Sequence, residues 1–434
     1  MLWAVMKFSA GPSTIIINQK YLNEFMSMDM KTNYSKINIF ALVLFLIAGT
    51  AHLSTAQIAI LGDTIYTMES DPIVNGVVLI KGDKIEEVGS SAEINIPADY
   101  KQYEASVVTP GLIDAHSVVG LAGIYNQDND QDQLEKSHAI QPELRAIDAY
   151  NPREKLVEFV RSLGITTIHT GHGPGALVSG QTLIAKTSGT TVAESVVDST
   201  FALAMTLGPG VSQNYKKPGT RSKGMAMLRQ ELIKAQDYAE KQAAEDESKR
   251  PARDLSMEML AKMLSGEIPA MITAQKTTEI DAALRLADEF GFRLILDGAA
   301  EAYLMLDEIK QSGVDVFIHP TMVRNFGGTK NATLETAAKL KANNIKFAFQ
   351  SGYEGYVPKT RIVLFEAAMA AANGLSRENA LQAITKDAAK ILGIENSVGS
   401  LAAGKDADVV LFDGDPFEYT THVSGVFING KMVS

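Results

Sequence analysis

The sequence predicts an α/β fold, a (β/α)8 TIM-type barrel joined to a small composite β-sandwich that both chain ends form. Strands and helices alternate through the middle of the 434-residue chain, and short strands with turn signals fill its two flanks. The alternation alone would also suit a doubly wound sheet, but the length of the region and the strand-rich flanks favour the barrel. We therefore assign residues 57–108 and 396–434 to the β-sandwich and residues 109–395 to the barrel.

The flanking strands are recognised by their apolar runs and turn residues. Near the start, residues 77–80 form an apolar run, and Gly82 begins a turn before the next short strand. Near the end, residues 407–412 and 425–428 have the same character, and Asn429 begins an Asn-Gly hairpin signal. Strands at ends so distant in sequence predict one β-domain to which both ends contribute.

The barrel region contains β-type apolar runs separated by helical patterns. The helix before the second barrel strand should begin at Pro152, with Asn151 as its cap and Glu154 in the capping-box position. Residues 223–254 are charged and helical, and we interpret them as a solvated helix and linker. Further strands are predicted at 165–168, 268–273, 293–296, 314–318 and 345–349, and further helices at 279–290 and 300–311.

The first part of the chain has the pattern of a targeting segment rather than of a folded domain. A basic stretch precedes a largely apolar run over 37–48, and Ser54 and Ala56 are small residues at cleavage positions. We predict that residues 1–56 are an upstream extension and a cleaved signal peptide, with translation starting at Met30. The protein is then expected in the periplasm or outside the cell. An uncleaved N-terminal anchor is the alternative.

The composition restricts the kinds of site and partner. The chain has no cysteine, so a metal could be bound only by histidine, carboxylate, lysine or water. The formal net charge of −11 argues against a nucleic-acid partner and, together with export, favours a small-molecule substrate. No stable membrane span is expected once the signal peptide is removed.

Several motifs of the chain are similar to those of one enzyme family. They are NGVVLIKGDKIEEVG at 75–89, VVTPGLIDAH at 107–116, GITTIHT at 164–170, GSLAAGKDADVVLFDGDP at 399–416 and VFINGKMV at 426–433. With these motifs the mature chain resembles the amidohydrolase superfamily, in its imidazolonepropionase-related branch. The resemblance implies a barrel flanked by a β-sandwich from both chain ends, and a homodimer as a common assembly. It also implies hydrolysis of amide or related C–N bonds by a metal-activated water.

The metal ligands that the family places at the ends of barrel strands are mostly replaced in this chain. The family has His-x-His on the first strand, His on the fifth and sixth, and Asp on the eighth. The matching residues here are His116, Val118, Thr273, Gly298 and Gly352. Asp297 is the one carboxylate or histidine directly at the later strand ends. With these replacements the family's metal site cannot hold zinc, because zinc needs three or four donors.

Three interpretations of the remaining histidines stay open. His116, His169 and His172 could converge at the barrel mouth on one divalent metal, zinc before others, with an open position for water. Alternatively, these histidines hydrogen-bond within a polar mouth and no metal is bound. In the third interpretation the chemistry needs no metal, and His116 or His172 is a general base.

The other predicted site residues also lie near the ends of barrel strands. The catalytic candidates are Asp297, Glu354 and His319, and the substrate-binding candidates are Tyr353, Gln181 and Lys186. Lys186 matches the carboxylated lysine of some relatives, and pairing with a carboxylate is its alternative role. The predicted function is hydrolysis of non-peptide or cyclic C–N bonds in a small molecule. The alternative is a non-catalytic small-molecule-binding protein.

Overall fold

The computed structural model describes residues 57–125, 127–318, 327–353 and 363–434. The predicted signal peptide, His319 and Glu354 lie outside the described residues. Within the described ranges, no helix is both long and apolar enough to cross a membrane.

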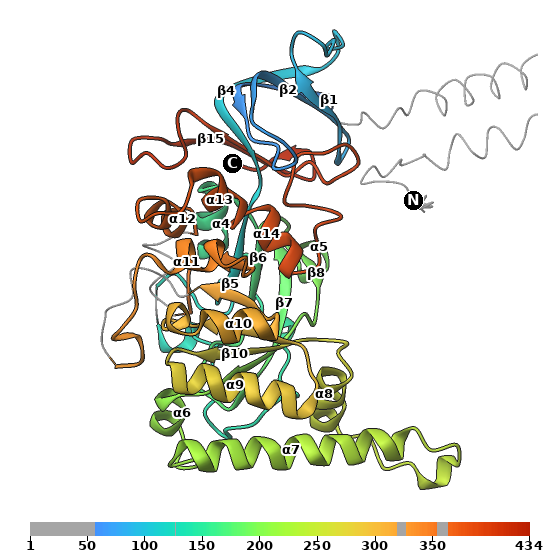
Figure 1. Cartoon of the computed structure of the whole chain (residues 1–434). Helices are drawn as coiled ribbons and strands as arrows, with labels where there is room; N and C mark the ends of the chain where they lie inside the picture. The colour runs from blue at the N-terminus through green and yellow to red at the C-terminus, as the bar shows by residue number, and fades with distance from the viewer. Residues whose placement is uncertain (1–56, 126, 319–326, 354–362) are drawn as a thin grey trace, which may run out of the picture. The chain divides into compact units, whose positions relative to one another are not determined.

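The strands of the two chain ends pair in one seven-stranded sheet, which confirms the predicted composite β-domain (Figure 1). β4 joins the two ends, because it pairs in parallel with β1 on one side and antiparallel with β14 on the other. The predicted turns at Gly82 and Asn429 connect neighbouring strands, and both residues have the positive φ that such turns need. In sheet order, the strands are β16 (Lys431–Met432), β15 (Val423–Ile428), β14 (Val409–Phe412), β4 (Lys101–Pro110), β1 (Gln57–Ile65), β2 (Ile73–Lys81) and β3 (Lys84–Ser90).

A second sheet of nine strands forms the predicted barrel, with eight of its strands on one path. The path closes through a parallel bridge between Ser117 and Gly352, which brings the first and last strands together. The strands on the path are β5 (Leu112–Ser117), β6 (Ile165–Gly171), β7 (Val178–Lys186), β9 (Leu203–Thr206), β10 (Ala270–Ala274), β11 (Leu294–Gly298), β12 (Asp315–Ile318) and β13 (Phe347–Phe349).

One barrel strand departs from the regular pattern, because β7 runs antiparallel to both of its neighbours, β6 and β9. The short segment 172–177 connects β6 to β7 without a helix, whereas a parallel neighbour would require a long crossover. The small strand β8 (Val196–Asp198) pairs with β7 outside the path. As a consequence, the mouth is built from the carboxyl ends of the other strands and from the amino end of β7.

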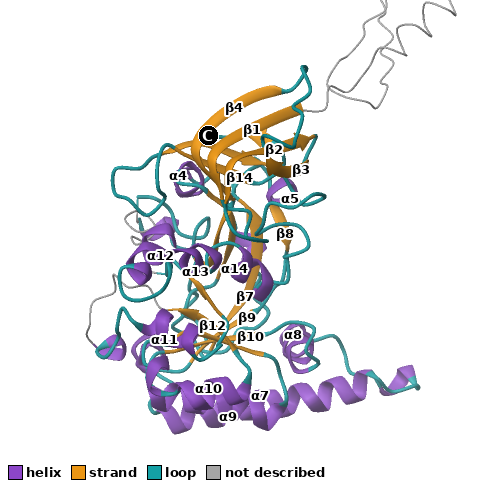
Figure 2. Ribbon diagram, turned by 45° about the horizontal axis from the view of Figure 1, so that its top comes forward, coloured by secondary structure: helices purple, strands orange, loops and turns teal. Residues whose placement is uncertain are grey.

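The barrel interior is arranged in layers, since every second residue of a strand points inward. An apolar layer includes Ile113, Met271, Ile295 and Phe317, and the helix α14 (Lys386–Ile391) covers it with Ala388 and Ile391. Figures 1 and 2 both show α14 between the barrel strands and the terminal sheet. Two residues further along β10 and β11 the inward side chains are polar, namely Thr273 and Asp297. This polar layer lies at the mouth and forms the candidate site.

The remaining helices pack around the barrel and connect its strands. The helix predicted to begin at Pro152 begins at Lys155, because the Glu154 side chain accepts a hydrogen bond from the Leu156 backbone and caps the helix there. The charged segment predicted to be helical contains α7, which lies beside α9 (Figure 2). Arg229 of α7 pairs with Glu289 of α9. The helices are α3 (Ala146–Ala149), α4 (Lys155–Ser162), α5 (Val192–Ser195), α6 (Pro209–Asn214), α7 (Arg221–Gln242), α8 (Leu255–Leu264), α9 (Thr277–Phe290), α10 (Leu306–Ser312), α11 (Thr336–Ala342), α12 (Val363–Ala371) and α13 (Arg377–Gln382).

Candidate active site at the barrel mouth

A buried histidine–aspartate pair occupies the centre of the polar layer. His116 near the end of β5 and Asp297 near the end of β11 are both fully buried. The Nδ1 atom of His116 lies 2.8 Å from Oδ1 of Asp297. A carboxylate can only accept a hydrogen bond, so Nδ1 of His116 carries the proton and donates it to Asp297. The pair joins strands on opposite sides of the barrel across its axis.

The Asp297 carboxylate also accepts hydrogen bonds from two further side chains. Thr273 on β10 donates its hydroxyl to Oδ2 at 2.5 Å, and Gln350 after β13 donates Nε2 to Oδ1 at 2.8 Å. Burial alone would raise the pKa of Asp297, but the nearby His116 ring and these hydrogen bonds outweigh it and lower the pKa. Asp297 is therefore a carboxylate at neutral pH.

The second ring nitrogen of His116 has no protein partner among the described residues. Nε2 is buried and makes no hydrogen bond, although the ring itself is held by Asp297 at Nδ1. The Tyr353 ring lies 6.1 Å from the His116 ring, and the His169 ring lies 5.6 Å from it. In the neutral form of the ring, with the proton on Nδ1, Nε2 has a lone pair that can accept a proton or a hydrogen bond from a ligand.

His169 is bound to the scaffold at both ring nitrogens. Its Nδ1 lies 2.6 Å from the Ala115 carbonyl, and its Nε2 lies 2.7 Å from the Thr182 hydroxyl. A carbonyl accepts, so Nδ1 donates to Ala115 and Nε2 accepts from Thr182. Burial lowers the pKa of His169 to about 3. His169 is therefore neutral and offers no lone pair to a metal.

His172 is buried in the connection between β6 and β7. Its ring packs against Gly180, where an added Cβ would approach His172 Cδ2 to 2.5 Å. Neither ring nitrogen has a hydrogen-bond partner among the described residues, and burial lowers the pKa to about 4. In the described ranges, no three His, Asp or Glu side chains are grouped to hold a metal ion. The structure thus does not assemble the predicted three-histidine site.

The described side chains at the mouth do not fit a zinc ion. Val118, at the place of the second histidine of the first strand, is an apolar residue with no exposed surface. In the polar layer, His169 and Asp297 already bind protein groups. Nε2 of His116 then remains as the one free donor from a described histidine or carboxylate of that layer, and zinc needs at least three donors.

The period-two pattern of the strands also corrects two aligned positions. Gly298 and Gly352 match the metal ligands of the sixth and eighth strands by sequence. The side chains that meet inside the barrel at those strands are Asp297 and Gln350, whose Nε2 donates to the Asp297 carboxylate. Counting every second residue from the buried inward residues of β11 and β13 would have identified both Asp297 and Gln350. Gln350 was missed because an amide is not a typical ligand or catalytic group.

Lys186 is not at the mouth, which corrects its predicted role in substrate binding. Its ammonium lies 2.5 Å from the Asp408 carboxylate and 3.1 Å from that of Asp406. Both aspartates belong to the GKDAD motif that precedes β14. Since β7 is antiparallel, its carboxyl end and Lys186 lie at the opposite end of the barrel. The alternative role, pairing with a carboxylate, is the one that the structure gives.

Of the other two substrate-binding candidates, one lies beside the site and one is held by the scaffold. Tyr353 lies beside His116, and its hydroxyl is 3.4 Å from Nε2 of Gln275. Gln181 is buried, and its amide nitrogen donates to the Pro142 carbonyl at 3.1 Å. The Gln181 side chain is therefore held by hydrogen bonding to the loop before α3.

A second buried carboxyl group closes the barrel next to the site. Asp114 on β5 accepts hydrogen bonds from the Ser351 backbone N–H at 3.0 Å and from the Ser351 hydroxyl. Burial raises the pKa of Asp114 to about 6, although these hydrogen bonds oppose the shift. Asp114 thus ties the start of the barrel to the segment after β13 and fixes His116, whose backbone N–H also donates to it at 3.3 Å.

Comparisons with known proteins agree with this architecture. The model of the Amidohydrolase family matches residues 330–433. The chain is 25% identical to the imidazolonepropionase of Fusobacterium nucleatum, over 83% of this chain and 91% of that protein. The crystal structure of an amidohydrolase from Thermotoga maritima has a TM-score of 0.82 and 29% identity, covering 87% of this chain and 99% of the other. Molinate hydrolase shares the fold, with a TM-score of 0.54 at 14% identity.

The barrel, the terminal sheet and the comparisons lead to one assignment. The relatives are hydrolases of C–N bonds, and members of this family typically depend on a metal. In sequence and fold the chain is similar to the amidohydrolase superfamily, with an imidazolonepropionase among its relatives.

Proposed function

We propose that this protein is an exported hydrolase that cleaves non-peptide or cyclic C–N bonds of a small molecule, with His116 as its general base. One observation carries the proposal: His116 donates Nδ1–H to Asp297 at 2.8 Å and keeps a buried Nε2 without a protein partner. An imidazole oriented by a carboxylate is a typical general base near neutral pH. The low pKa of Asp297 supports this, because the carboxylate stays charged and stabilises a protonated ring.

The proposed reaction uses one water and returns its protons to the products. Nε2 of His116 takes a proton from the water, and the hydroxide adds to the carbonyl carbon of the scissile bond. The C–N bond of the tetrahedral intermediate then breaks, and the imidazolium gives its proton to the departing nitrogen. The products are a carboxylic acid and an amine, or one molecule that carries both groups if the substrate is cyclic. Tyr353 is proposed to line the substrate pocket.

The test uses the chain from Gln57 onward, without a histidine tag, and a panel of five-membered cyclic amides and N-acyl amino acids. We expect hydrolysis that persists in a chelator, and metal content far below one ion per chain by elemental analysis. His116→Gln should lower kcat/KM by about 100-fold or more. His422→Gln, at an exposed histidine that also pairs with an aspartate, should have no effect. Activity that is lost in chelator and restored by zinc would instead establish a metal site.

A second candidate function is binding without catalysis. It is favoured by the number of mouth groups that bind only the scaffold, namely both nitrogens of His169 and both oxygens of Asp297. In that case a cyclic amide would bind and stabilise the protein against heat but would be recovered intact. Turnover by the unchanged chain that His116→Gln abolishes would rule this candidate out.

A further inference from the structure

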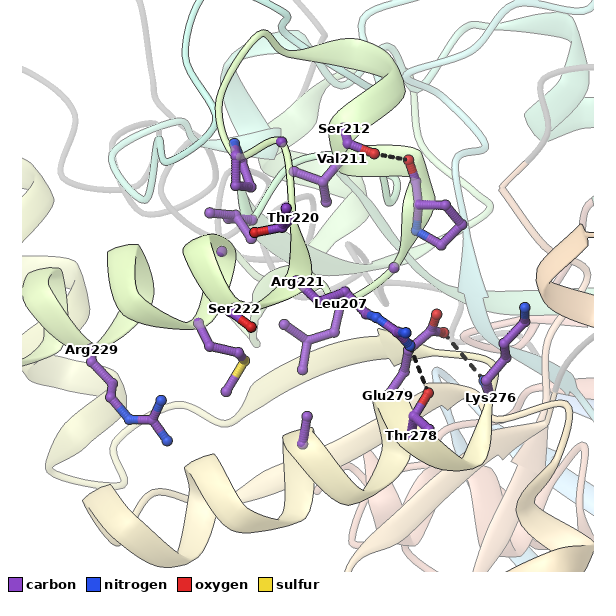
Figure 3. Close-up of a pocket in the computed structure, with 18 of the residues that line it drawn as sticks. Leu207, Val211, Ser212, Thr220, Arg221, Ser222, Arg229, Lys276, Thr278 and Glu279 are labelled. Atoms are coloured by element: carbon purple, nitrogen blue, oxygen red, sulfur yellow. Dashed lines mark hydrogen bonds between the residues drawn. The ribbon is translucent and has the colours of Figure 1, made fainter.

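A cleft on the flank of the barrel lies outside the proposed active site (Figure 3). It has a volume of about 750 Å³ and lies among the segment after β9, the start of α7 and the start of α9. This size is within the range of small-molecule sites. Apolar side chains, Leu177, Leu207, Val211 and Met225, line part of it. The cleft can therefore hold the apolar body of a small organic molecule.

The charged residues of the cleft are mostly cationic, although the whole chain is acidic at −11. Two of its arginines are neutralised: Arg229 by Glu289 at 2.7 Å, and Arg285 by Asp281 at 2.9 Å. The other two cations, Arg221 and Lys276, have no carboxylate within 4.0 Å among the described residues. An anionic ligand would supply the missing partner.

The single acidic residue in the lining does not fulfil that role. Glu279 is buried, and its carboxylate accepts hydrogen bonds from the backbone N–H groups of Gln275 and Lys276 at 3.0 and 3.2 Å. The Glu279 carboxylate is thus already hydrogen-bonded to backbone N–H groups at the start of α9. The Arg221 guanidinium is held in place, since Nη1 donates to the Thr278 hydroxyl at 2.8 Å. Its other N–H groups remain available.

We propose that this cleft binds a small organic carboxylate with an apolar body, whose carboxylate pairs with Arg221 and Lys276. The planar guanidinium matches a carboxylate with two parallel hydrogen bonds, and the lysine adds a mobile charge. The apolar residues cover the rest of the ligand. Figure 3 shows Lys276 and Arg229 at opposite ends of the cleft, so the carboxylate end is the one with Lys276. The site is independent of the proposed reaction at His116.

The test measures binding directly, by calorimetry on the whole mature chain. The probes are 4-phenylbutanoate, 4-phenylbutanol, acetate and inorganic phosphate. We expect 4-phenylbutanoate to bind, and to bind more weakly at high salt, while the alcohol, acetate and phosphate bind much more weakly. Arg221→Gln and Lys276→Gln should each lower the affinity about tenfold, the usual effect of losing a hydrogen bond to a charged group.

Two further variants complete the design. Ala282→Glu adds an anion to a half-buried position of the cleft and should prevent binding. Lys431→Gln removes an exposed charge in the terminal sheet and should leave the affinity unchanged. Equal binding of the alcohol, equal binding of phosphate, or affinity unaffected by both cleft substitutions would overturn the proposal. Because binding is measured without substrate, failure of the hydrolase assay would not affect this result.

Discussion

At the residue scale, the described side chains of the barrel mouth are organised by Asp297. Three side chains, His116, Thr273 and Gln350, donate to this one carboxylate. The sequence predicted His116 and Asp297, because a histidine and a carboxylate at strand ends are unusual. It could not predict Gln350, because an amide has meaning at this position only once its partner across the barrel is known.

Replacing Asp297 should affect both stability and activity. In Asp297→Asn the carboxylate is lost, and the donors of His116, Thr273 and Gln350 face an amide that cannot accept all of them. We expect the free energy of unfolding to fall by about 3 kcal/mol, as for other broken buried pairs. Urea unfolding measures it. Asp413→Asn is the matched control, since Asp413 pairs with an exposed histidine, and it should show no measurable loss. Equal stability of the two variants would contradict the central role of Asp297.

The buried histidines predict how stability depends on pH. His169 and His172 have pKa values of about 3 and about 4 in the folded protein, against 6.5 as the ordinary value. The unfolded chain therefore binds more protons as the pH falls below 6.5, so acid destabilises the fold. Asp114, with a pKa raised to about 6, acts in the opposite direction between pH 6 and pH 4, because its protonated form is favoured by folding.

A substitution separates these contributions. In His169→Gln, the loss of stability between pH 6.5 and pH 4 should become shallower by roughly 1.4 kcal/mol per pH unit. Urea unfolding at several pH values measures the slope for the variant and the unchanged chain. His422→Gln, at an exposed site, should keep the original slope. The same slope in all three proteins would mean that His169 is not buried in its neutral form.

At the scale of elements, β7 explains why part of the site was predicted wrongly. An apolar run has the same sequence pattern in parallel and antiparallel strands, so its direction could not be inferred. The helix α4 shows a similar limit, because the sequence predicts Asn151 as the cap and Glu154 in the capping-box position, whereas Glu154 caps the helix in the structure. Apolar runs predicted β6 and β10 to β13, whereas β7 and β9 were not predicted as strands.

The position of β7 gives Lys186 a structural role that can be tested. Lys186→Met leaves the buried Asp408 without its cation, whereas Asp406 keeps its ion pair with Lys84 at 2.6 Å. We expect a loss of about 3–5 kcal/mol in the free energy of unfolding. Adding Asp408→Asn should recover part of the loss, because the uncompensated charge is then removed. A Lys186→Met protein that is fully stable but has a raised KM would restore the substrate-binding role.

At the scale of the whole described unit, the terminal sheet and the barrel share chain segments. β4 continues after Gly111 directly into β5, and the Lys186 pair links the barrel to the motif before β14. The barrel and the composite sheet were predictable as a pair because each repeats a pattern over many residues. The contacts that close the barrel and link it to the terminal sheet could not be predicted, since they join single residues far apart in sequence.

These links predict that the two sheets unfold together. Urea unfolding of the mature chain should show one transition with the same midpoint by far-UV circular dichroism and by tyrosine fluorescence. A chain that ends at Asp408 lacks β14, β15 and β16 and leaves one edge of β4 unpaired, so it should not fold cooperatively. Two separated transitions in the full mature chain would show that the sheets are independent domains.

The bond between Asp114 and Ser351 also sets an order for synthesis, because the two residues are 237 positions apart. When β5 leaves the ribosome, the strand that will cover its open edge has not yet been made. That edge must stay unpaired until more than half of the protein has been synthesised after it. An unpaired strand edge promotes aggregation between chains. A nascent barrel of this kind depends on its surroundings, such as holding chaperones, until its last strand arrives.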